Sequence, residues 1–408
     1  MFNRESNIIV GLEIGTSKVC CIVAELDDKG VPTIIGIGQS RSNGVRKSEI
    51  IDQERAIEEV SIAINEAEQM SDVEVKNVYL AVTGSHIKAF TCNGFHPIHA
   101  ASKVITQADV DEVIRNAKTV NIPPGDMIVH SIRQHFIVDQ KEDVINPLDM
   151  LGTKLEVNIL IVHGSQSRVQ TPVRLLKNQL QIEVDNVVFS GLASSLALLN
   201  KEQKEIGTLV IDLGAGTTDY VVTVDGLVKH CGVIAVGGDH ITNDLAQGLR
   251  LPIGQAEQLK IKFGSAIPPA NIPDKFVVIE NDLGLKAKTI NLEHLYLIMA
   301  LRIEETLELI RQDLQETGII DSLRGGVVLC GGGARIPRIL ELTEHVFQLP
   351  AMIGNPVAIG GISSALKQPE FVTPIGLIKF ASMFKRKSVS PRYSLTDYLK
   401  NIFGTFGK

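Results

Sequence analysis

Apolar residues in this chain form two strand–turn–strand segments that resemble each other. The later one covers residues 207–222 and reads GTLVIDLGAGTTDYVV, and the earlier one covers residues 8–23 and reads IIVGLEIGTSKVCCIV. In each, an apolar run rich in β-branched residues leads into an acid, a glycine turn and a second apolar strand. Glu13 aligns with Asp212, and Gly15 aligns with Gly214. The repeat predicts a duplicated α/β domain whose halves face each other.

The chemistry of the two glycine turns favours a phosphate ligand. Such a turn can point backbone N–H groups and hydroxyls into one concavity, and a carboxylate beside it can hold a hydrated magnesium ion. For one segment alone, an ordinary β-hairpin whose buried Asp caps its own turn is the alternative. Two facing copies favour a nucleotide site, with Glu13 and Asp212 orienting the waters of Mg²⁺. The predicted phosphate-binding residues are Gly15, Thr16, Ser17, Lys18, Gly214, Ala215, Gly216, Thr217, Thr218 and, at a helix start, Gly238.

Further segments show helical or strand periodicity. Helices are predicted at 52–70, 107–120, 166–180, 191–199, 237–249, 252–262 and 292–315, and strands at 77–82, 88–92, 132–138, 155–162 and 184–189. Thr106 is a predicted helix N-cap with Asp109 at position N3. The small residues of 191–199 would let two domains approach closely. Residues 325–339, GGVVLCGGGARIPRI, predict a third strand that ends in glycines.

Composition limits the class of protein. The chain has 408 residues, enough for two to four domains, and its net charge of -7 makes nucleic acid a poor partner. The five cysteines form no CxxC pair, which indicates buried thiols in a reducing cytosol. We expect neither a signal peptide nor a membrane-spanning segment. Six histidines of the middle region are predicted to be surface or loop residues: His86, His96, His99, His130, His135 and His163.

The two turns and the late glycine turn, in this order, resemble the actin-like ATPase superfamily. Together with a terminal amphipathic helix, the segments GLEIGTSKV, SGLASSLALL, IDLGAGTTDY and VLCGGGARI resemble the FtsA family of bacterial cell-division proteins over essentially the whole chain. The resemblance implies an α/β fold of duplicated ribonuclease-H-like domains with an inserted, ferredoxin-like α+β subdomain. The implied divisions are 1A (1–83, 166–203 and 351–383), 1C (84–165), 2A (204–228 and 303–350), 2B (229–302), a linker (384–392) and a membrane-targeting helix (393–408).

The adenosine part of the ligand is expected at the late glycine turn. Backbone at Gly331, Gly332, Gly333 and Ala334 would lie against the base, with Arg335 alongside, because a planar base needs close backbone approach. Glu257 and Lys260 are either an exposed ion pair or, by resemblance, a ribose-binding pair. Lys18 is either a phosphate contact or a plain exposed strand residue.

Hydrolysis of ATP needs a group that orients the attacking water. In strongly hydrolytic relatives, a Glu or Gln stands at the start of the connecting helix. The matching stretch here, residues 189–194, reads FSGLAS and has neither. We also find no catalytic acid between the two turns. The sequence therefore predicts a protein that binds ATP and Mg²⁺ but hydrolyses ATP slowly or not at all.

The end of the chain predicts a membrane-binding helix. Residues 394–406 read SLTDYLKNIFGTF, and basic residues of 385–392 precede them. Seven of the eighteen aromatic residues follow residue 370, which favours an interface-seeking helix beside an anionic membrane surface. A terminal helix packed on its own domain is the alternative. The residues on the apolar side are Leu395, Tyr398, Leu399, Ile402, Phe403 and Phe406.

The resemblance implies a function in cell division. The protein would polymerise on the cytoplasmic face of the inner membrane at the division site and would anchor FtsZ filaments. The C-terminal peptide of FtsZ would dock on the 2B region, with Arg302 in the contact unless it is an ordinary helix-surface arginine. Late divisome proteins would bind 1C. A pilus-assembly scaffold of related architecture is the alternative, and a sugar- or acetate-type kinase is a further one.

Overall fold

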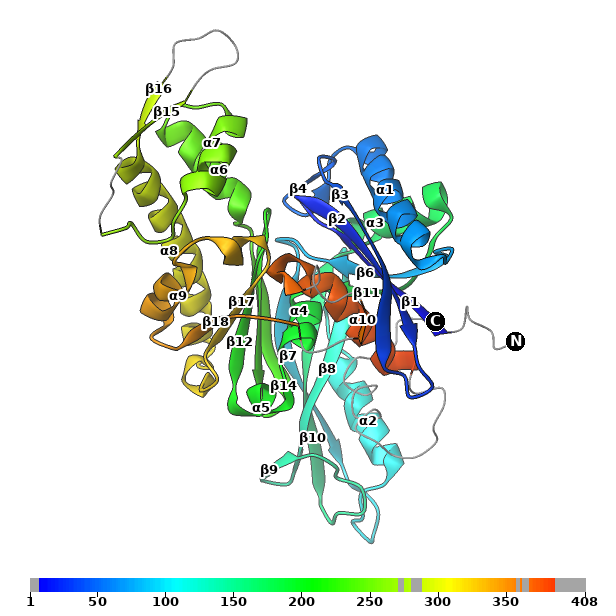
Figure 1. The fold of residues 1–408 in the computed structure, drawn as a ribbon. Coiled ribbons are helices and arrows are strands. Elements are labelled where there is room, and N and C mark those ends of the chain that lie inside the picture. The colour runs from blue at the N-terminus through cyan, green and yellow to red at the C-terminus, as the bar shows by residue number, and fades with distance from the viewer. Residues whose placement is uncertain (1–6, 271–274, 280–287, 357–359, 362–366, 386–408) are drawn as a thin grey trace.

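The computed structural model of the chain describes residues 7–270, 275–279, 288–356, 360–361 and 367–385. Two large sheets lie on either side of a central helical layer, and a third sheet extends away from the first (Figure 1). The first large domain contains β1 (Ile8–Ile14), β2 (Lys18–Leu26), β3 (Pro32–Arg41), β6 (Asn77–Val82), β11 (Glu183–Phe189) and β19 (Gly360–Gly361). Their order in the sheet is β11-β6-β1-β2-β3-β19.

The sheet of the second large domain repeats this arrangement. It contains β12 (Thr208–Leu213), β13 (Thr218–Val224), β14 (Leu227–Ile234), β17 (Val327–Cys330) and β18 (Ala351–Ile353), in the order β14-β13-β12-β17-β18. In both sheets the first three strands pair antiparallel and the last two join parallel. The predicted duplication is therefore confirmed. Since β18 pairs with β17, residues 351–353 belong to this second sheet, and the expected domain boundary before residue 351 is wrong by a few residues.

Alternating side chains of the first sheet fill two different cores. On β2, Val19, Cys21 and Val23 face α1 (Gln53–Ser71) and α3 (Gln166–Leu180), whereas Cys20 and Ile22 face the central layer. That layer consists of α4 (Ser190–Leu198) and α10 (Val372–Lys385). Because both faces of the sheet are covered, its strands read as continuous apolar runs.

Helix α4 is the point where the two large domains meet. All nine of its residues are buried, and its apolar side chains share one core with residues of both large sheets, such as Val188 and Val210. The small residues allow this approach: a Cβ on Gly376 of α10 would come within 1.9 Å of the Ala193 carbonyl oxygen. The predicted close approach of domains at this helix is confirmed.

The outer face of the second sheet is covered by longer helices. Helix α8 carries the predicted apolar stripe, and Leu295, Met299, Ile303, Leu307 and Ile310 are buried. The helices of this domain are α5 (Lys201–Ile206), α6 (Gly238–Gly248), α7 (Ile253–Phe263), α8 (Leu292–Glu316) and α9 (Ile339–Phe347), with short turns η2 (Ile320–Ser322) and η3 (Gly332–Arg335) and strands β15 (Phe276–Ile279) and β16 (Lys288–Asn291). A third turn, η5 (Pro369–Phe371), leads into α10.

The inserted region is one antiparallel sheet with one helix. Its elements are β7 (Lys88–Pro97), α2 (Gln107–Lys118), β8 (Asp126–Val138), β9 (Lys141–Val144) and β10 (Lys154–Ser165), with sheet order β7-β10-β8-β9. A ferredoxin-like unit has two helices, so that expectation is wrong in this respect. The other face of the sheet packs on the first large domain and on β14 of the second, and Val129, Ile132 and Leu160 join the central core.

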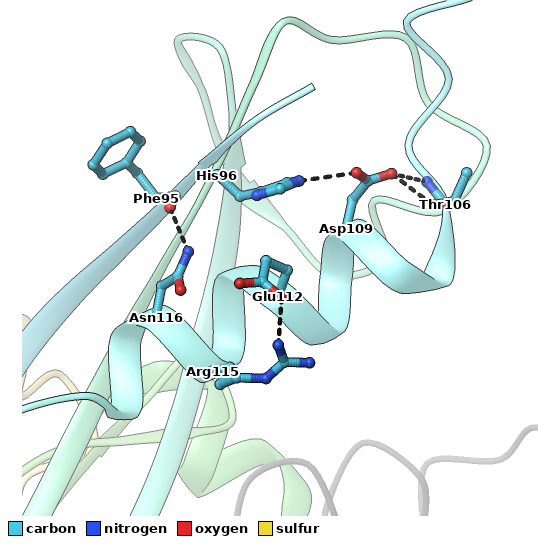
Figure 2. A network of polar contacts seen from close by, with 7 residues as sticks. All are labelled: Phe95, His96, Thr106, Asp109, Glu112, Arg115 and Asn116. Atoms are coloured by element: carbon cyan, nitrogen blue, oxygen red, sulfur yellow. Dashed lines mark hydrogen bonds and ion pairs between the residues drawn. The ribbon is translucent and has the colours of Figure 1, made fainter. Parts of the chain in front are cut away.

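Polar contacts tie α2 to the edge strand β7 (Figure 2). Thr106 donates from its amide and its hydroxyl to Asp109 at 2.8 and 2.6 Å, which confirms the predicted N-cap. Asp109 also contacts His96 Nε2 at 3.0 Å, and Asn116 donates to the carbonyl of Phe95 at 3.2 Å. One carbonyl of the sheet edge is thus occupied by the chain's own helix, which makes this edge less available to other strands.

Two histidines of the insert are buried, so their prediction as surface or loop residues is wrong. His130 accepts the amide N–H of Phe189 at 3.0 Å, and burial lowers its pKa to about 3. His163 lies 2.7 Å from Asp126 and packs edge-on against Phe90. Both residues lie on strands that join two domains, where a histidine with a satisfied nitrogen can occupy a core position.

Three of the seven late aromatic residues belong to the core and its border. Phe371 and Phe380 are buried, and Phe384 packs partly buried against Phe380 with ring centroids 4.7 Å apart. Part of the aromatic content after residue 370 therefore belongs to the packing of α10. No helix within the described ranges is long and apolar enough to cross a bilayer.

Candidate functional site

The two glycine turns have the same geometry. The amide of Gly15 donates to the carbonyl of Lys18 at 3.0 Å, and the amide of Gly214 donates to that of Thr217 at 3.0 Å. A Cβ on Gly15 or Gly214 would lie only 2.9 or 2.8 Å from the carbonyl oxygen that accepts this bond. Glycine is therefore required by close approach, and the alignment of the two copies is confirmed.

The turns of the two large domains lie against each other. A Cβ on Gly216 would come within 2.4 Å of Thr16 Oγ1 and 2.9 Å of the Cα of Lys47. Ser48 donates its amide to Thr16 Oγ1 at 3.0 Å and places its hydroxyl 3.3 Å from that of Thr217. Backbone and hydroxyl groups of both domains are thus gathered in one place, as a phosphate-binding site requires.

Three carboxylates lie at the base of this site. Burial raises the pKa of Glu13 to about 7; Lys18 counteracts the rise and Asp212 adds to it. Burial and then the neighbouring Asp212 also raise the pKa of Asp219 well above its usual range. Glu13 Oε2 makes no hydrogen bond to any described residue and has only Lys18 Nζ nearby, at 3.7 Å. A divalent cation at this position would offset the repulsion among these three acids and favour their ionised forms.

Sequence reasoning did not include Asp219 among the predicted site residues. Asp219 is buried on β13 and accepts a hydrogen bond of 2.6 Å from Thr83. It stands directly across the hairpin from Asp212. Pairing the two strands of the hairpin outward from the glycine turn would have placed Asp219 opposite Asp212. Because like charges directly opposite each other are unfavourable, this pair would have marked Asp219 as a site residue.

The central helices hold Asp212 in place. Ser194 of α4 and Thr373 of α10 donate to Asp212 Oδ2 at 2.7 and 2.8 Å. At the start of α4, Ser190 donates to the carbonyl of Val82 at 3.2 Å. All nine residues of this helix are Ser, Gly, Leu or Ala, so it offers no acid or amide to orient water. Asp212 is therefore fixed by both helices between the two domains.

Lys18 is not a plain exposed strand residue. Its ammonium lies 4.5 Å from the ring centroid of Phe371 and donates to the carbonyl of Glu370. About a fifth of the side chain is exposed (20%). Its contact with a phosphate stays a prediction, and it would require Lys18 to exchange at least one of these partners.

The late glycine turn packs against the second phosphate turn. Gly331 has φ 79°, and a Cβ there would meet Asp212 Oδ1 at 2.4 Å. A Cβ on Gly333 would meet the Cβ of Leu213 at 2.7 Å, whereas Gly332 has no atom within 4 Å of the equivalent position. Ala334 is buried, and the guanidinium of Arg335 binds Glu370 at 2.6 and 3.0 Å. The backbone at Gly332 is thus the open part of this turn.

Glu257 and Lys260 form more than an exposed ion pair. Lys260 Nζ lies 2.6 Å from Glu257, 2.8 Å from the hydroxyl of Thr242 and 3.0 Å from the carbonyl of Gly238. Helix α7 is thereby fixed to the start of α6. The amide of Gly238 already donates to the carbonyl of Gly214 at 3.0 Å. In this arrangement Gly238 supports the second turn, and the predicted phosphate contact cannot use this amide.

Arg302 on α8 is half-buried and paired within the chain. It contacts Asp244 at 2.5 Å and also donates to Glu305. The predicted membrane-binding residues lie outside the described residues: Leu395, Tyr398, Leu399, Ile402, Phe403 and Phe406. Throughout the described part of the chain, no three or more His, Cys, Asp or Glu side chains are grouped closely enough to hold a metal ion directly.

The repeated sheets, the shared helical layer and the facing turns define an actin-like fold. Among solved structures, a PilM–PilN type IV pilus biogenesis complex matches with a TM-score of 0.66 at 16% identity, covering 92% of this chain and 98% of that chain. MreB5 of Spiroplasma citri bound to ADP matches with a TM-score of 0.56 at 15% identity, covering 94% and 99%. Identities this low establish the fold alone.

Sequence comparisons define the family. A family model described as cell division protein FtsA matches residues 209–376, and one described as the SHS2 domain inserted in FtsA matches residues 84–163. Cell division protein FtsA of Borreliella burgdorferi is 38% identical over 92% of this chain and 91% of its own length. That of Escherichia coli K12 is 30% identical over 92% and 90%. The chain belongs to the FtsA family of cell-division proteins.

Family membership bears on the alternatives left open by the sequence. The pilus complex shares the fold at 16% identity, whereas the sequence relatives at 38% and 30% identity are cell division proteins. Cell division is therefore favoured over pilus assembly and over a kinase. The match at 84–163 also agrees with the predicted extent of the insert.

Proposed function

We propose that the chain binds ATP with Mg²⁺ between its two glycine turns. The turn backbone that follows Gly15 and Gly214, whose own amides close the turns, and hydroxyls at Thr16 and Thr217 would hold the phosphates. Glu13, Asp212 and Asp219 would hold the hydrated Mg²⁺, whose charge offsets that of the phosphates. The observation that carries the proposal is the meeting of two equivalent turns above three carboxylates, of which Asp219 is buried and Glu13 and Asp212 are partly buried. The structure of S. citri MreB5 bound to ADP shows that this fold accepts a nucleotide in another protein.

The adenosine would lie along the second large domain. The open backbone at Gly332 offers a surface to the base, and the Lys260–Glu257 pair lies at the start of α6, where a ribose would follow. Equilibrium titration with ATP, with and without Mg²⁺, tests the site. We expect Mg²⁺-dependent binding, and absence of binding in both conditions would overturn the proposal.

We propose further that hydrolysis is slow and that the nucleotide acts mainly as a clamp between domains. The start of α4 supplies no Glu or Gln, and Asp219, the additional acid, is already bonded to Thr83. A nucleotide that binds one domain arrangement better than another would shift self-assembly by changing populations. Single-turnover measurement of phosphate formation tests this, and a rate on the order of 1–100 per second, as in kinases, would exclude it.

In the cell, the protein would anchor FtsZ filaments to the inner membrane at the division site and would assemble with itself. The region of α8, β15 and β16 offers an apolar surface for the FtsZ C-terminal peptide. Leu297 and Leu301 lie one helical turn apart and are 53% and 57% exposed, and Phe276 of β15 is 61% exposed. Arg302 would have to exchange Asp244 or Glu305 for a peptide carboxylate.

The terminal segment would provide the membrane contact. Its apolar residues recur at helical spacing, and the basic residues of 385–392 would attract anionic lipids. A chain ending at Lys387 should lose flotation with anionic liposomes while keeping ATP binding. With the full chain, liposomes and FtsZ together, we expect FtsZ on the membrane only when both the tail and ATP are present. Failure of the full chain to bind membrane and to recruit FtsZ would refute this function.

A further inference from the structure

A short hairpin of the first large domain reaches into the site, although nothing in the sequence pattern marked it. It consists of β4 (Val45–Arg46) and β5 (Glu49–Ile50), joined by the two residues Lys47 and Ser48 (Figure 1). Lys47 and Ser48 have φ of 51° and 62°. Such a turn ordinarily uses Asn and Gly, because other residues are strained at positive φ. Strain of this kind persists where the surrounding structure enforces it, often at functional sites.

The hairpin is fixed on two sides. At its base, the buried carboxylate of Glu59 on α1 accepts the amides of Asn43 at 2.6 Å and Gly44 at 3.2 Å. On its flank, Glu49 forms an ion pair of 2.6 Å with Arg168 of α3. These contacts hold the hairpin against two different helices of the first large domain. The position of its tip is therefore set by the fold and not by the tip's own sequence preference.

The tip touches both glycine turns. Ser48 contacts Thr16 of the first turn at 3.0 Å and Thr217 of the second at 3.3 Å. A Cβ added to Gly216 would come within 2.9 Å of the Cα of Lys47. Glycine at 216 thus leaves room for Lys47 to pass directly over the second turn. The hairpin closes the side of the site that faces the first large domain.

Charge distinguishes Lys47 from Lys18. Lys18 is engaged by Glu13, the Glu370 carbonyl and the Phe371 ring. Lys47 is exposed and, within the described ranges, has no carboxylate at ion-pair distance. The backbone of Lys47 lies over the second turn, and burial, followed by the charge of Lys47, lowers the pKa of His240 near the start of α6. An uncompensated cation over a phosphate turn is suited to bind a phosphate oxygen.

We propose that Lys47 is a third phosphate-binding element, which contacts the terminal phosphate of a nucleoside triphosphate and favours the triphosphate over the diphosphate. The proposal rests on the nucleotide function proposed above. The adenosine candidates, Gly332 and Lys260, lie on the second large domain, so the far end of the nucleotide points toward the hairpin of the first. A phosphate that binds Lys47 would also connect the two turns through Ser48.

The test compares binding of ATP and ADP, each with Mg²⁺, to the full chain and to three variants. Lys47→Ala removes the cation, and Lys47→Arg keeps it. Lys103→Ala is a matched control, because Lys103 is an exposed lysine of the insert with φ 52°. One lost charge-assisted contact predicts about tenfold weaker ATP binding by Lys47→Ala and a change of less than about twofold for ADP. Lys47→Arg should stay close to the unmodified chain, and Lys103→Ala should bind both as the unmodified chain does.

Several outcomes would overturn the proposal. Equal loss of ATP and ADP binding would mean that Lys47 serves the shared phosphates or the fold. Unchanged binding by Lys47→Ala would mean that Lys47 makes no phosphate contact. If the unmodified chain binds neither nucleotide, the proposed nucleotide function fails together with this proposal. If the unmodified chain binds both nucleotides and Lys47→Ala leaves the ratio of ATP affinity to ADP affinity unchanged, this proposal alone fails. Thermal unfolding without nucleotide, expected to be the same for all four chains, detects a purely structural effect.

Discussion

The two glycine turns have the same backbone and different surroundings. Both start with a glycine whose amide closes a four-residue turn, and both follow an acid by two residues. The second turn packs against α6, the late glycines and α4, and its acid Asp212 accepts two side-chain hydroxyls. The first turn packs against the β4–β5 hairpin, and its acid Glu13 lies 3.7 Å from the ammonium of Lys18.

This difference shows which properties come from the turn and which from its neighbours. A hydrogen-bonded glycine turn has one geometry wherever it occurs, because sterics allow few alternatives. The charge state of the adjacent acid depends instead on burial and on the partners supplied by distant segments. The first turn therefore presents an acid that is hard to ionise, and the second presents one that is firmly oriented. Each prediction below tests one side of this contrast.

The largest effect is expected from Asp212→Ala. Removing the acid eliminates a charge at the Mg²⁺ position and leaves the hydroxyls of Ser194 and Thr373 without their acceptor. A loss of about 3 kcal/mol in the free energy of binding predicts roughly 100-fold weaker Mg²⁺-dependent ATP binding. The free energy of unfolding should fall by about 2 kcal/mol. Calorimetric titration and urea unfolding measure these effects. Asp212→Asn keeps an acceptor oxygen, so it should lose ATP binding and retain most of the stability; equal destabilisation by both variants would contradict this explanation.

A matched pair of substitutions tests the equivalence of the turns. In Gly15→Ala and Gly214→Ala, the added methyl would lie 2.9 and 2.8 Å from the carbonyl oxygen of the same turn. Each should destabilise the chain by about 1–3 kcal/mol, and the two losses should agree. Urea unfolding measures both, and Gly254→Ala on α7, where a Cβ meets no atom within 4 Å, is the control. A difference of more than about 1 kcal/mol between the two variants would show that neighbouring segments, and not the turn, set the cost.

The pH dependence of stability should report the first turn. Because burial raises the pKa of Glu13 from 4.5 to about 7, protonated Glu13 suits the folded chain better than the carboxylate does. The stability that protonated Glu13 gives the folded chain is fully present below pH 4.5 and is lost as the pH rises through about 7. Without Mg²⁺ and nucleotide, Glu13→Gln should therefore be more stable than the unmodified chain at pH 8, by on the order of 2 kcal/mol, and nearly equal to it at pH 4.5. If the melting temperatures of the unmodified chain and of Glu13→Gln change with pH in parallel, Glu13 is not the group responsible for the pH dependence of stability.

The smallest effect is expected from Lys18→Met. The ammonium of Lys18 lowers the pKa of Glu13, so its removal should move the loss of stability upward by about one pH unit. Methionine keeps much of the packing against Phe371, which limits other consequences. Melting curves between pH 5 and 9 measure the shift, with Lys177→Met on the exposed face of α3 as control. An unchanged midpoint would indicate that solvent already screens this lysine from Glu13.

Much of the fold followed from short sequence patterns. Apolar strand runs, the apolar stripe of α8 and the Thr106–Asp109 cap are local, and the structure has each where it was expected. The two glycine turns also stand where the sequence placed them, because glycine is required there by local geometry. The ferredoxin-like expectation for the insert, the surface placement of His130 and His163, and the boundary at residue 351 were wrong. Each of those depends on which distant surface a segment packs against.

The sequence by itself determined that two halves repeat, that each begins with an acid and a glycine turn, and that the connecting helix is built of small residues. These are properties of neighbouring residues and follow from local sterics and periodicity. Only the tertiary structure decided that Ser194 and Thr373 orient Asp212 and that Lys47 lies over the second turn. Those relations join segments up to 169 residues apart, as between Lys47 and Gly216, and the free energy that sets them comes from packing and burial, which no short stretch of sequence encodes.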